Sequence, residues 1–181
     1  MGPPGVGKGT QAKILKEELG IIHLSTGEIL RREIAIESDI GEIAKEFIDQ
    51  GKLVPDNFLL DIVREWIKKP DCFNGYLLDG FPRTIPQAIG LNTINKTHSN
   101  YLDAAINLTA DEDELIKRIL IRKKRDPNRS DDSLSIIKKR QQVYWKQTAP
   151  LIDFYKKMGI LKNVNGLGNI EEVTKLILEL I

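Results

Sequence analysis

Short apolar runs alternate along the chain with longer stretches in which apolar residues recur every three or four positions. The short runs have the length of buried strands, and the longer stretches have the periodicity of amphipathic helices. We expect strands at residues 21–24, 76–79, 104–108 and 161–164. Because helical patterns alternate with these runs along the chain, the strands should be parallel and covered by helices on both faces, as in an α/β protein.

The helical patterns fill most of the remaining sequence. Thr109 and Asn169 each stand three residues before a glutamate, the spacing of a capping box at a helix N-terminus. Gly20 ends the first helical stretch. The stretches cover residues 8–19, 27–51 with a break at 38–41, 55–68, the segment after residue 109, 130–157 and the segment after residue 169.

A glycine-rich segment, Met-Gly-Pro-Pro-Gly-Val-Gly-Lys-Gly-Thr, opens the chain directly before the first helical pattern. Glycines allow the backbone to aim successive N–H groups at one centre, and the following helix adds its positive N-terminal end. Lys8 adds a mobile positive charge. Gly9 takes the place that the usual pattern gives to Ser or Thr, so Thr10 carries the hydroxyl. The segment predicts a loop that binds nucleotide phosphates.

Composition narrows the class of protein. The 181 residues are 41% hydrophobic and 29% charged, which is ordinary for one compact domain with insertions. The net charge of +1 gives no general attraction to nucleic acid or to anionic membranes, and no apolar run approaches the ~20 residues of a membrane span. Cys72 is the single cysteine, which excludes an intrachain disulfide and a zinc–cysteine site and fits a reduced, cytoplasmic setting.

Polar residues follow the predicted strands, where parallel sheets bind their ligands. Asp79, at the end of one strand, suits a magnesium-bound water beside a phosphate loop. Gly80 permits close approach of a ligand, and Arg83 can clamp a phosphate. Phe81-Pro82 is a candidate cis peptide bond. An ordinary strand-to-loop turn capped by the aspartate is the weaker alternative.

Thr26 and Arg31 follow another predicted strand. Their spacing suits a second phosphate, although a helix cap beside a solvated arginine explains that segment better when it is taken alone.

Arg118 and Arg122 lie four residues apart, on one helix face, and Arg129 and Arg140 follow them. A solvated helix face is the usual explanation of such a charged stretch, and RNA contact is a weaker one because no aromatic residues interleave. Taken together, the arginines suggest convergence on a phosphoryl group, whose transfer depends on charge stabilisation and positioning. A phosphate acceptor is already ionised, so no catalytic His or Cys is required.

Six segments resemble motifs of the adenylate kinases, within the nucleoside monophosphate kinases, in the order in which that family has them. The resemblance spans essentially the whole chain. It implies a P-loop, three-layer α/β/α fold and the reaction ATP + AMP ⇌ 2 ADP, with Mg²⁺ and without zinc. It also implies a cytoplasmic monomer whose partners are ATP, AMP and ADP. The segments are residues 2–11, 24–31, 51–56, 77–88, 129–132 and 148–151.

The resemblance further implies roles for individual residues. ATP would be bound by Gly5, Val6, Gly7, Lys8, Gly9, Thr10, Arg118, Arg122 and Gly168. AMP would be bound by Thr26, Arg31, Lys52, Leu53, Val54, Gly80, Phe81, Arg83, Gln87, Arg129 and Arg140, with Gln87 reading the adenine. The catalytic set would be Lys8, Arg83, Arg118, Arg122, Arg129 and Arg140. Asp79 would order a magnesium-bound water, with Glu28 as a second metal candidate.

By the same resemblance the chain divides into a core, an AMP-binding segment at 25–55 and a short lid at 122–129. The core consists of residues 1–24, 56–121 and 130–181. Two departures concern side chains. Glu28 stands where the family commonly has Asp, and the basic residues Lys123, Lys124 and Arg125 of the lid have no assigned role.

The third departure concerns the first strand, which is central to the family's sheet. A phosphate loop normally follows a strand of about five apolar residues, and only Met1 precedes the loop here. We therefore expect four strands and a middle slot that is open, filled by a neighbour or closed by rearrangement. A start codon placed too far downstream is the leading explanation. Losing several buried side chains at ~2 kcal/mol each would cost about 10 kcal/mol, so weak activity is expected.

Two alternatives stay open at this point. A UMP/CMP kinase shares the short lid, although Thr26 favours AMP because the pyrimidine kinases tend to have Ala there. A truncated nucleotide-binding protein with little or no turnover is the alternative of a different class, and the absent strand motivates it.

Overall fold

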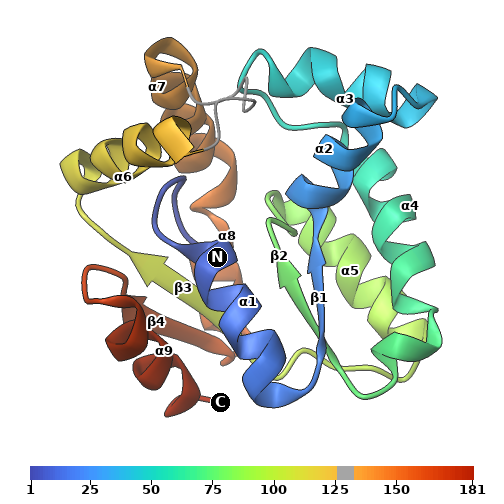
Figure 1. Cartoon of the computed structure of the whole chain (residues 1–181). Helices are drawn as coiled ribbons and strands as arrows, with labels where there is room; N and C mark the ends of the chain where they lie inside the picture. Colours follow the sequence, from blue (N-terminus) through green and yellow to red (C-terminus); the bar gives the residue numbers. More distant parts are fainter. Residues whose placement is uncertain (126–132) are drawn as a thin grey trace.

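The computed structural model describes residues 1–125 and 133–181 (Figure 1). Within them β1 (Ile22–Ser25) pairs with β2 (Tyr76–Asp79), and β3 (Ala105–Thr109) pairs with β4 (Leu161–Asn165). Both pairs are parallel, with Ile22 opposite Tyr76 and Ala105 opposite Leu161. The predicted α/β class with parallel strands is confirmed, and the described strands divide into two separate pairs.

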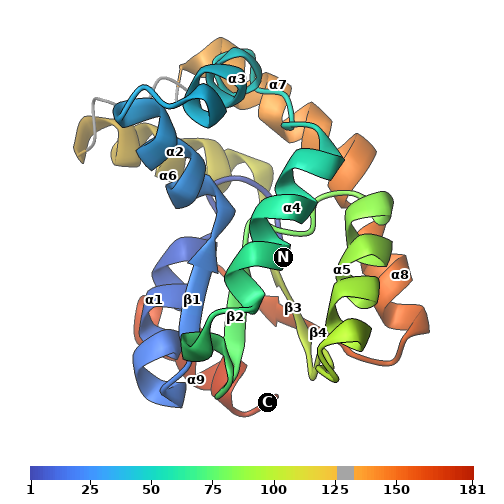
Figure 2. The same cartoon turned by 90° about the vertical axis from the view of Figure 1, so that its right-hand side faces the viewer.

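Helices cover both faces of the strands, in three layers that Figure 2 shows from the side. On one face lie α1 (Lys8–Leu19) and α9 (Ile170–Leu178). On the other lie α4 (Asp56–Ile67), α5 (Ile85–Thr97) and α8 (Leu151–Lys157). Near the carboxyl ends of the strands stand α2 (Thr26–Ala35), α3 (Asp39–Ile48), α6 (Glu112–Arg125) and α7 (Leu134–Val143). In the described ranges no helix is both long and apolar enough to cross a membrane.

Several local predictions are confirmed. Gly20 ends α1 with a φ of 62°, the left-handed conformation that glycine adopts most easily. Asn169 and Glu172 form a complete capping box at the start of α9. The peptide bond between Phe81 and Pro82 is cis.

Thr109 does not cap a helix, contrary to the prediction. It is the last residue of β3, and its hydroxyl donates to the carbonyl of Val164 at 3.4 Å. Helix α6 begins three residues later, at Glu112. Pairing with β4 therefore extends the strand through the residue that resembled a helix cap.

Two helical stretches break at other places than predicted. The stretch at 27–51 is interrupted at 36–38, because Ser38 caps α3 by accepting the N–H of Gly41 at 3.1 Å. The stretch at 130–157 is not one helix in its described part. There α7 leads into the π-helix η3 (Tyr144–Thr148), and Pro150, which has no N–H to donate, precedes α8. A short 3₁₀ helix, η1 (Pro70–Cys72), precedes β2.

Each strand pair has its own hydrophobic core. Leu24, Val63 and Leu91 are buried between the β1–β2 pair and helices α2 to α5. The core of the β3–β4 pair lies toward α1, α6 and α9. A third, smaller cluster joins α5 to α8 through Ala88 and Tyr155. The two larger cores meet at β2, since Leu77 of that strand packs against the core of the β3–β4 pair.

Met1 lies between the two strand pairs, as Figure 1 shows for the N-terminus. Its ammonium donates to the carbonyl of Ile106, and its carbonyl accepts the N–H of Leu108 at 3.1 Å. A residue that bonds in this way to both neighbours of Asn107 stands opposite Asn107 in a parallel ladder. In the described residues no strand pairs with the second edge of β2.

Candidate nucleotide-binding site

The loop before α1 has the backbone that the glycine pattern predicts. Gly5 and Gly7 have φ angles of 90° and 103°, which disfavour any residue with a Cβ atom. A Cβ on Gly5 would also lie 2.6 Å from the carbonyl oxygen of Leu115, so this side of the loop is packed closely against α6. Val6 is buried in the core of the β3–β4 pair, and its N–H donates to the carbonyl of Pro3 at 3.4 Å.

Lys8 begins α1 and folds back into the loop. Its Nζ donates to the carbonyl oxygens of Gly2 at 2.7 Å and Pro3 at 3.0 Å. Burial lowers the pKa of Lys8 to about 7, and the positive charge of Arg83 acts in the same direction while Asp79 opposes it. An anion in the loop would restore the full charge of the ammonium.

Two further arginines, Arg122 of α6 and Arg140 of α7, also lower the pKa of Lys8 through their charges. Together with Arg83, they bring positive charge from three separate elements toward one lysine. Of the four arginines predicted to converge, Arg122 and Arg140 act on Lys8 in this way. Arg129 lies outside the described residues.

Asp79 ends β2 close to Lys8. Burial alone would raise the pKa of this carboxyl, but the imidazole of His23 and the charge of Lys8 hold the pKa below its ordinary value. His23 Nε2 lies 3.6 Å from Asp79 Oδ2, longer than a normal hydrogen bond. An ionised carboxylate beside a phosphate loop is the oxygen ligand that Mg²⁺ takes directly or through water. The residues present therefore fit this ion.

Glu28, the second metal candidate, is half exposed and pairs with Lys13 of α1 at 3.2 Å. Its backbone N–H donates to the Ser25 hydroxyl, which caps α2. Among the described residues, no three His, Cys, Asp or Glu side chains cluster as metal ligands.

Residues from three elements form a polar pocket at the carboxyl ends of β1 and β2. The Thr26 hydroxyl donates to the carbonyl of Gly80 at 3.1 Å, and Arg83 Nε donates to the same oxygen at 2.8 Å. Gly80 has a φ of 77°, and a Cβ there would lie 3.0 Å from an Arg83 nitrogen. Arg31 folds over Gly27, where a Cβ would approach its guanidinium to 3.2 Å.

A cavity of about 820 Å³ joins this pocket to the phosphate loop. Most of the residues predicted to bind AMP line it. They are Thr26, Arg31, Lys52, Leu53, Val54, Gly80, Phe81, Arg83 and Arg140, and Lys8 and Asp79 line it too.

Gln87 is absent from this lining and is fully buried. Its Oε1 accepts the backbone N–H of Arg83 at 2.7 Å, and its Nε2 donates to Asp56 Oδ1 at 2.7 Å. The second oxygen of Asp56 accepts the Thr84 hydroxyl at 2.9 Å. A base would reach the Gln87 amide only after the side chains that cover it shift. Sequence analysis missed Asp56 as the partner of Gln87, because 31 residues separate the two.

On the other side of the loop, Arg118 is bonded to protein. Its guanidinium donates to the carbonyl of Gly166 at 2.8 Å and to Glu114 at 2.9 Å. Gly166 packs against the phosphate loop, since a Cβ there would lie 3.1 Å from Val6. The predicted Gly168 lies two residues farther on, in the turn before α9. Gly166 is thus the glycine that touches the loop, which its place directly after β4 could have indicated.

Comparison with known proteins agrees with this geometry. The profile of the family "Adenylate kinase" matches residues 1–160. The chain is 48% identical to an adenylate kinase of Leptospira biflexa, over 99% of this chain and 96% of that protein. It is 43% identical to one from Carboxydothermus hydrogenoformans (96% and 93% covered) and 41% identical to one from Archaeoglobus fulgidus (97% and 93%). The chain belongs to the adenylate kinase family and is a nucleoside monophosphate kinase.

Proposed function

We propose that the enzyme transfers the terminal phosphoryl group of ATP to AMP and releases two ADP. One observation supports this most: the cavity that contains Lys8 continues into a pocket lined by Thr26, Arg31 and Arg83. A single space therefore offers positive groups to the phosphates of two nucleotides. Such a space suits direct transfer between them.

ATP would bind through the phosphate loop. The backbone N–H groups of residues 5–10 and the Lys8 ammonium would hold its phosphates, and Arg122 would add charge from α6. We expect a different role for Arg118, because its guanidinium already donates to the carbonyl of Gly166. It would hold the segment after β4 against the loop, where the adenine of ATP would lie near Gly168.

AMP would bind in the polar pocket. Arg31 and Arg83 would hold its phosphate as bidentate partners. Gly80 and the 52–54 backbone would hold the nucleoside, and Gln87 would read the adenine once it is uncovered. The bond of Thr26 to the Gly80 carbonyl keeps the two walls of this pocket together.

Chemically, the residues around Lys8 supply charge rather than a base. An AMP phosphate oxygen would attack the terminal phosphorus of ATP, the bond to the bridging oxygen would break, and ADP would leave. Lys8, Arg83, Arg122 and Arg140 would offset the charge on the transferring group. Mg²⁺, with Asp79 holding one of its waters, would neutralise the ATP phosphates. Closure of the segment 25–55 would exclude water. Residues 126–129 of the predicted lid lie outside the described residues.

An assay of ADP formation with AMP, CMP or UMP as the acceptor tests the proposal. We expect AMP to have the highest kcat/KM. Preference for CMP or UMP would make the protein a pyrimidine nucleotide kinase instead. Rates no higher than those of Lys8→Met with every acceptor would make it a nucleotide-binding protein without turnover. The same proposal describes a cytoplasmic monomer, which the elution volume on a sizing column tests in part.

A further inference from the structure

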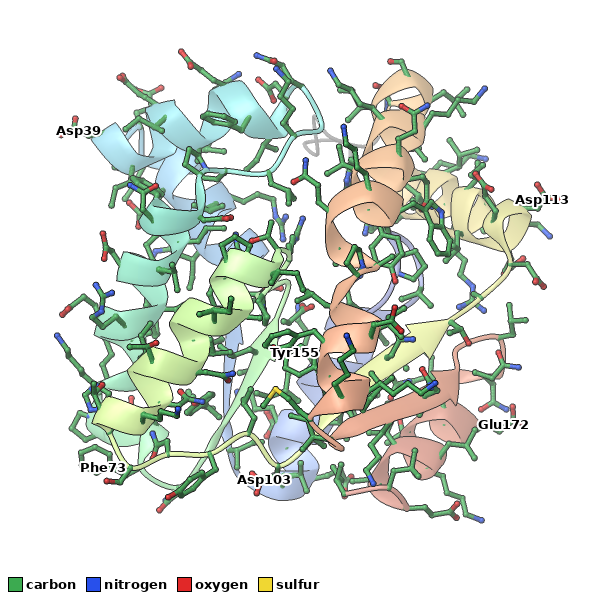
Figure 3. All side chains as sticks on the ribbon, turned by 180° about the vertical axis from the view of Figure 1, so that it is seen from behind. Asp39, Phe73, Asp103, Asp113, Tyr155 and Glu172 are labelled. Atoms are coloured by element: carbon green, nitrogen blue, oxygen red, sulfur yellow. The ribbon has the colours of Figure 1, made fainter. Side chains whose placement is uncertain are left out.

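The helical stretch from α7 to α8 contacts parts of the site that lie far apart in the sequence. Figure 3 shows it from behind, where α7, η3 and α8 follow one another down the molecule and Tyr155 of α8 is labelled. The segment 148–151, one of the six that resemble adenylate kinase motifs, lies at the junction of η3 and α8. The nucleotide-binding roles proposed above leave this segment unassigned.

The helix widens directly before this junction. The N–H of Ala149 donates to the carbonyl of Tyr144 at 2.9 Å, five residues back, which is the hydrogen bond of a π-helix. Pro150 follows and has no N–H, so the regular helical ladder cannot continue through it. A wide turn rotates the residues that end it relative to a regular α-helix, so it changes the direction of Thr148. Such turns are frequent at functional sites.

Thr148, the last residue of η3, bonds to the arginine proposed to clamp AMP. Its hydroxyl donates to the carbonyl of Arg83 at 2.9 Å, and the residue is only 8% exposed. The N–H of Arg83 is held separately by Gln87 Oε1 at 2.7 Å, and Arg83 Nε donates to the Gly80 carbonyl. Thr148 therefore ties Arg83 to the helical stretch that also carries Arg140.

At the other end of this stretch, α7 contacts the phosphate loop and the AMP-binding segment. Arg140 acts on Lys8 through its charge. The neighbouring Gln141 is buried, and its Nε2 donates to the carbonyl of Pro4 at 3.4 Å. A Cβ on Gly51 would lie 3.3 Å from Arg140 Cγ, so the turn after α3 packs against this side chain. One helical stretch is thus bonded to the phosphate loop and to the AMP pocket.

We propose that Thr148 is a positioning residue, whose bond to the Arg83 carbonyl keeps Arg83 at a fixed distance from Arg140 across the site of phosphoryl transfer. The proposal rests on the roles given above to these two arginines. Both guanidiniums have to reach one phosphoryl group, and a displacement of ~1 Å in such a site can lower the rate about 10²-fold. Loss of the hydroxyl should therefore affect transfer more than the binding of ATP.

Thr148→Val tests the proposal, because valine has nearly the shape of threonine and lacks the hydroxyl. We expect kcat with AMP to fall about tenfold and KM for ATP to change less than about twofold. Thr148→Ser keeps the hydroxyl and should keep most of the activity. Thr97→Val is the matched control, since the Thr97 hydroxyl donates to the Ile94 carbonyl at 2.7 Å, at the end of α5 away from Arg83. Its kcat should not change.

A double variant separates positioning from support of the fold. Arg83→Met lacks the guanidinium that Thr148 would position, so adding Thr148→Val to it should lower kcat by less than about twofold. Each variant is assayed at a temperature at which its circular dichroism is that of the folded protein. If Thr148→Val does not fold, Thr148→Ala, which also lacks the hydroxyl, replaces it.

Three outcomes would overturn the proposal. They are a kcat of Thr148→Val equal to that of the unchanged protein, an equal loss in Thr148→Ser, and a full tenfold further loss in the Arg83→Met background. Preference of the unchanged protein for CMP or UMP would contradict the proposed function instead. The same comparison, made with the preferred acceptor, would then still decide the role of Thr148.

Discussion

The half of the molecule built on β1 and β2 differs from the half built on β3 and β4 in how its polar site groups are held. In the first, Thr26 and Arg83 share the carbonyl of Gly80, and Gln87 is bonded to Asp56. In the second, Arg118 holds the backbone of Gly166. The side proposed to bind AMP, called the acceptor side below, is thus held by hydrogen bonds among its own residues. On the side proposed to bind ATP, the donor side, burial lowers the pKa of Lys8, so an anion there would favour its charged form.

The largest expected effect follows from changing Lys8. Charged residues of both halves, including Asp79 and Arg122, act on its ammonium. Lys8→Met should lower kcat by about 10²- to 10³-fold, the usual cost of removing a group that stabilises transition-state charge. Its Tm at pH 7 should not fall, because burial of a charged ammonium opposes folding. Lys16→Met, on the exposed face of α1, is the control and should leave kcat unchanged. A variant that keeps its activity would remove Lys8 from the site.

A substitution at Gly80 should affect binding of AMP without affecting binding of ATP. Gly80→Ala should raise KM for AMP about tenfold and leave KM for ATP unchanged, because a Cβ would press on Arg83 and Thr26. Gly159→Ala is a matched control with a φ of 76° and no atom within 4 Å of the added Cβ. Both variants should lose about 1 kcal/mol of stability through backbone strain. Equal effects on KM would mean that strain, and not the pocket, causes the change.

Asp56 should decide which base the acceptor side prefers. Its bond to Nε2, with the Arg83 N–H on Oε1, keeps the Gln87 amide in one orientation. The remaining N–H and oxygen of that amide complement N1 and the amino group of adenine, and they oppose the N–H and oxygen of a 6-oxopurine.

Asp56→Asn weakens the hold on Nε2, because an amide can present an N–H there in place of an oxygen, while the Arg83 N–H still holds Oε1. The ratio of kcat/KM for AMP to that for IMP should therefore fall, by up to about fivefold. Asp61→Asn, on the exposed face of the same helix, should leave the ratio unchanged. An unaltered ratio in Asp56→Asn would show that the contact only supports the fold.

The smallest effect concerns protons on the donor side. With a pKa of about 7, Lys8 is largely neutral at pH 8 in the free protein, and bound ATP should raise that pKa. Binding should therefore take up close to one proton at pH 8 and almost none at pH 6. Calorimetric titrations in two buffers of different ionisation enthalpy measure this uptake. Uptake that persists in Lys8→Met would assign the proton to another group.

Stability should also depend on pH through the buried Met1 ammonium. Its pKa of about 5 in the fold lies below the ordinary value of 8.0, so burying the charged form opposes folding. That cost is complete below pH 5 and fades as the pH rises to 8, so the free energy of unfolding should increase over this window. Denaturant titrations across the window measure the slope. A fall in stability between pH 5 and 8 would contradict the burial of this group.

Local signals predicted much of this structure. Strand β2 has the predicted bounds, because Tyr76 to Asp79 form an apolar run between turn residues. The Asn169 cap and the Gly20 terminus also follow from neighbouring residues alone. The prediction that Thr109 caps a helix was wrong because its capping pattern competes with strand pairing. The strand that pairs with it lies about 55 residues away in the sequence.

The features of the site that sequence patterns did not predict are hydrogen bonds between residues far apart in the sequence. The bond between Gln87 and Asp56 joins two helices, and neither segment alone indicates that the amide is covered. The hold of Arg118 on Gly166 likewise joins positions 48 residues apart. Most of the residues that the motifs assign to AMP line the cavity, but the motifs did not predict how those residues bond to one another.

The division of the strands into two pairs has a consequence for cooperativity. A continuous sheet melts as a unit because each strand is tied to the next, but β2 and β3 share no ladder in the described residues. Each pair also has a core of its own. Thermal unfolding should then proceed in two units, with a calorimetric enthalpy larger than the van't Hoff enthalpy. The half that melts first would set the temperature at which catalysis stops while the other half is still folded.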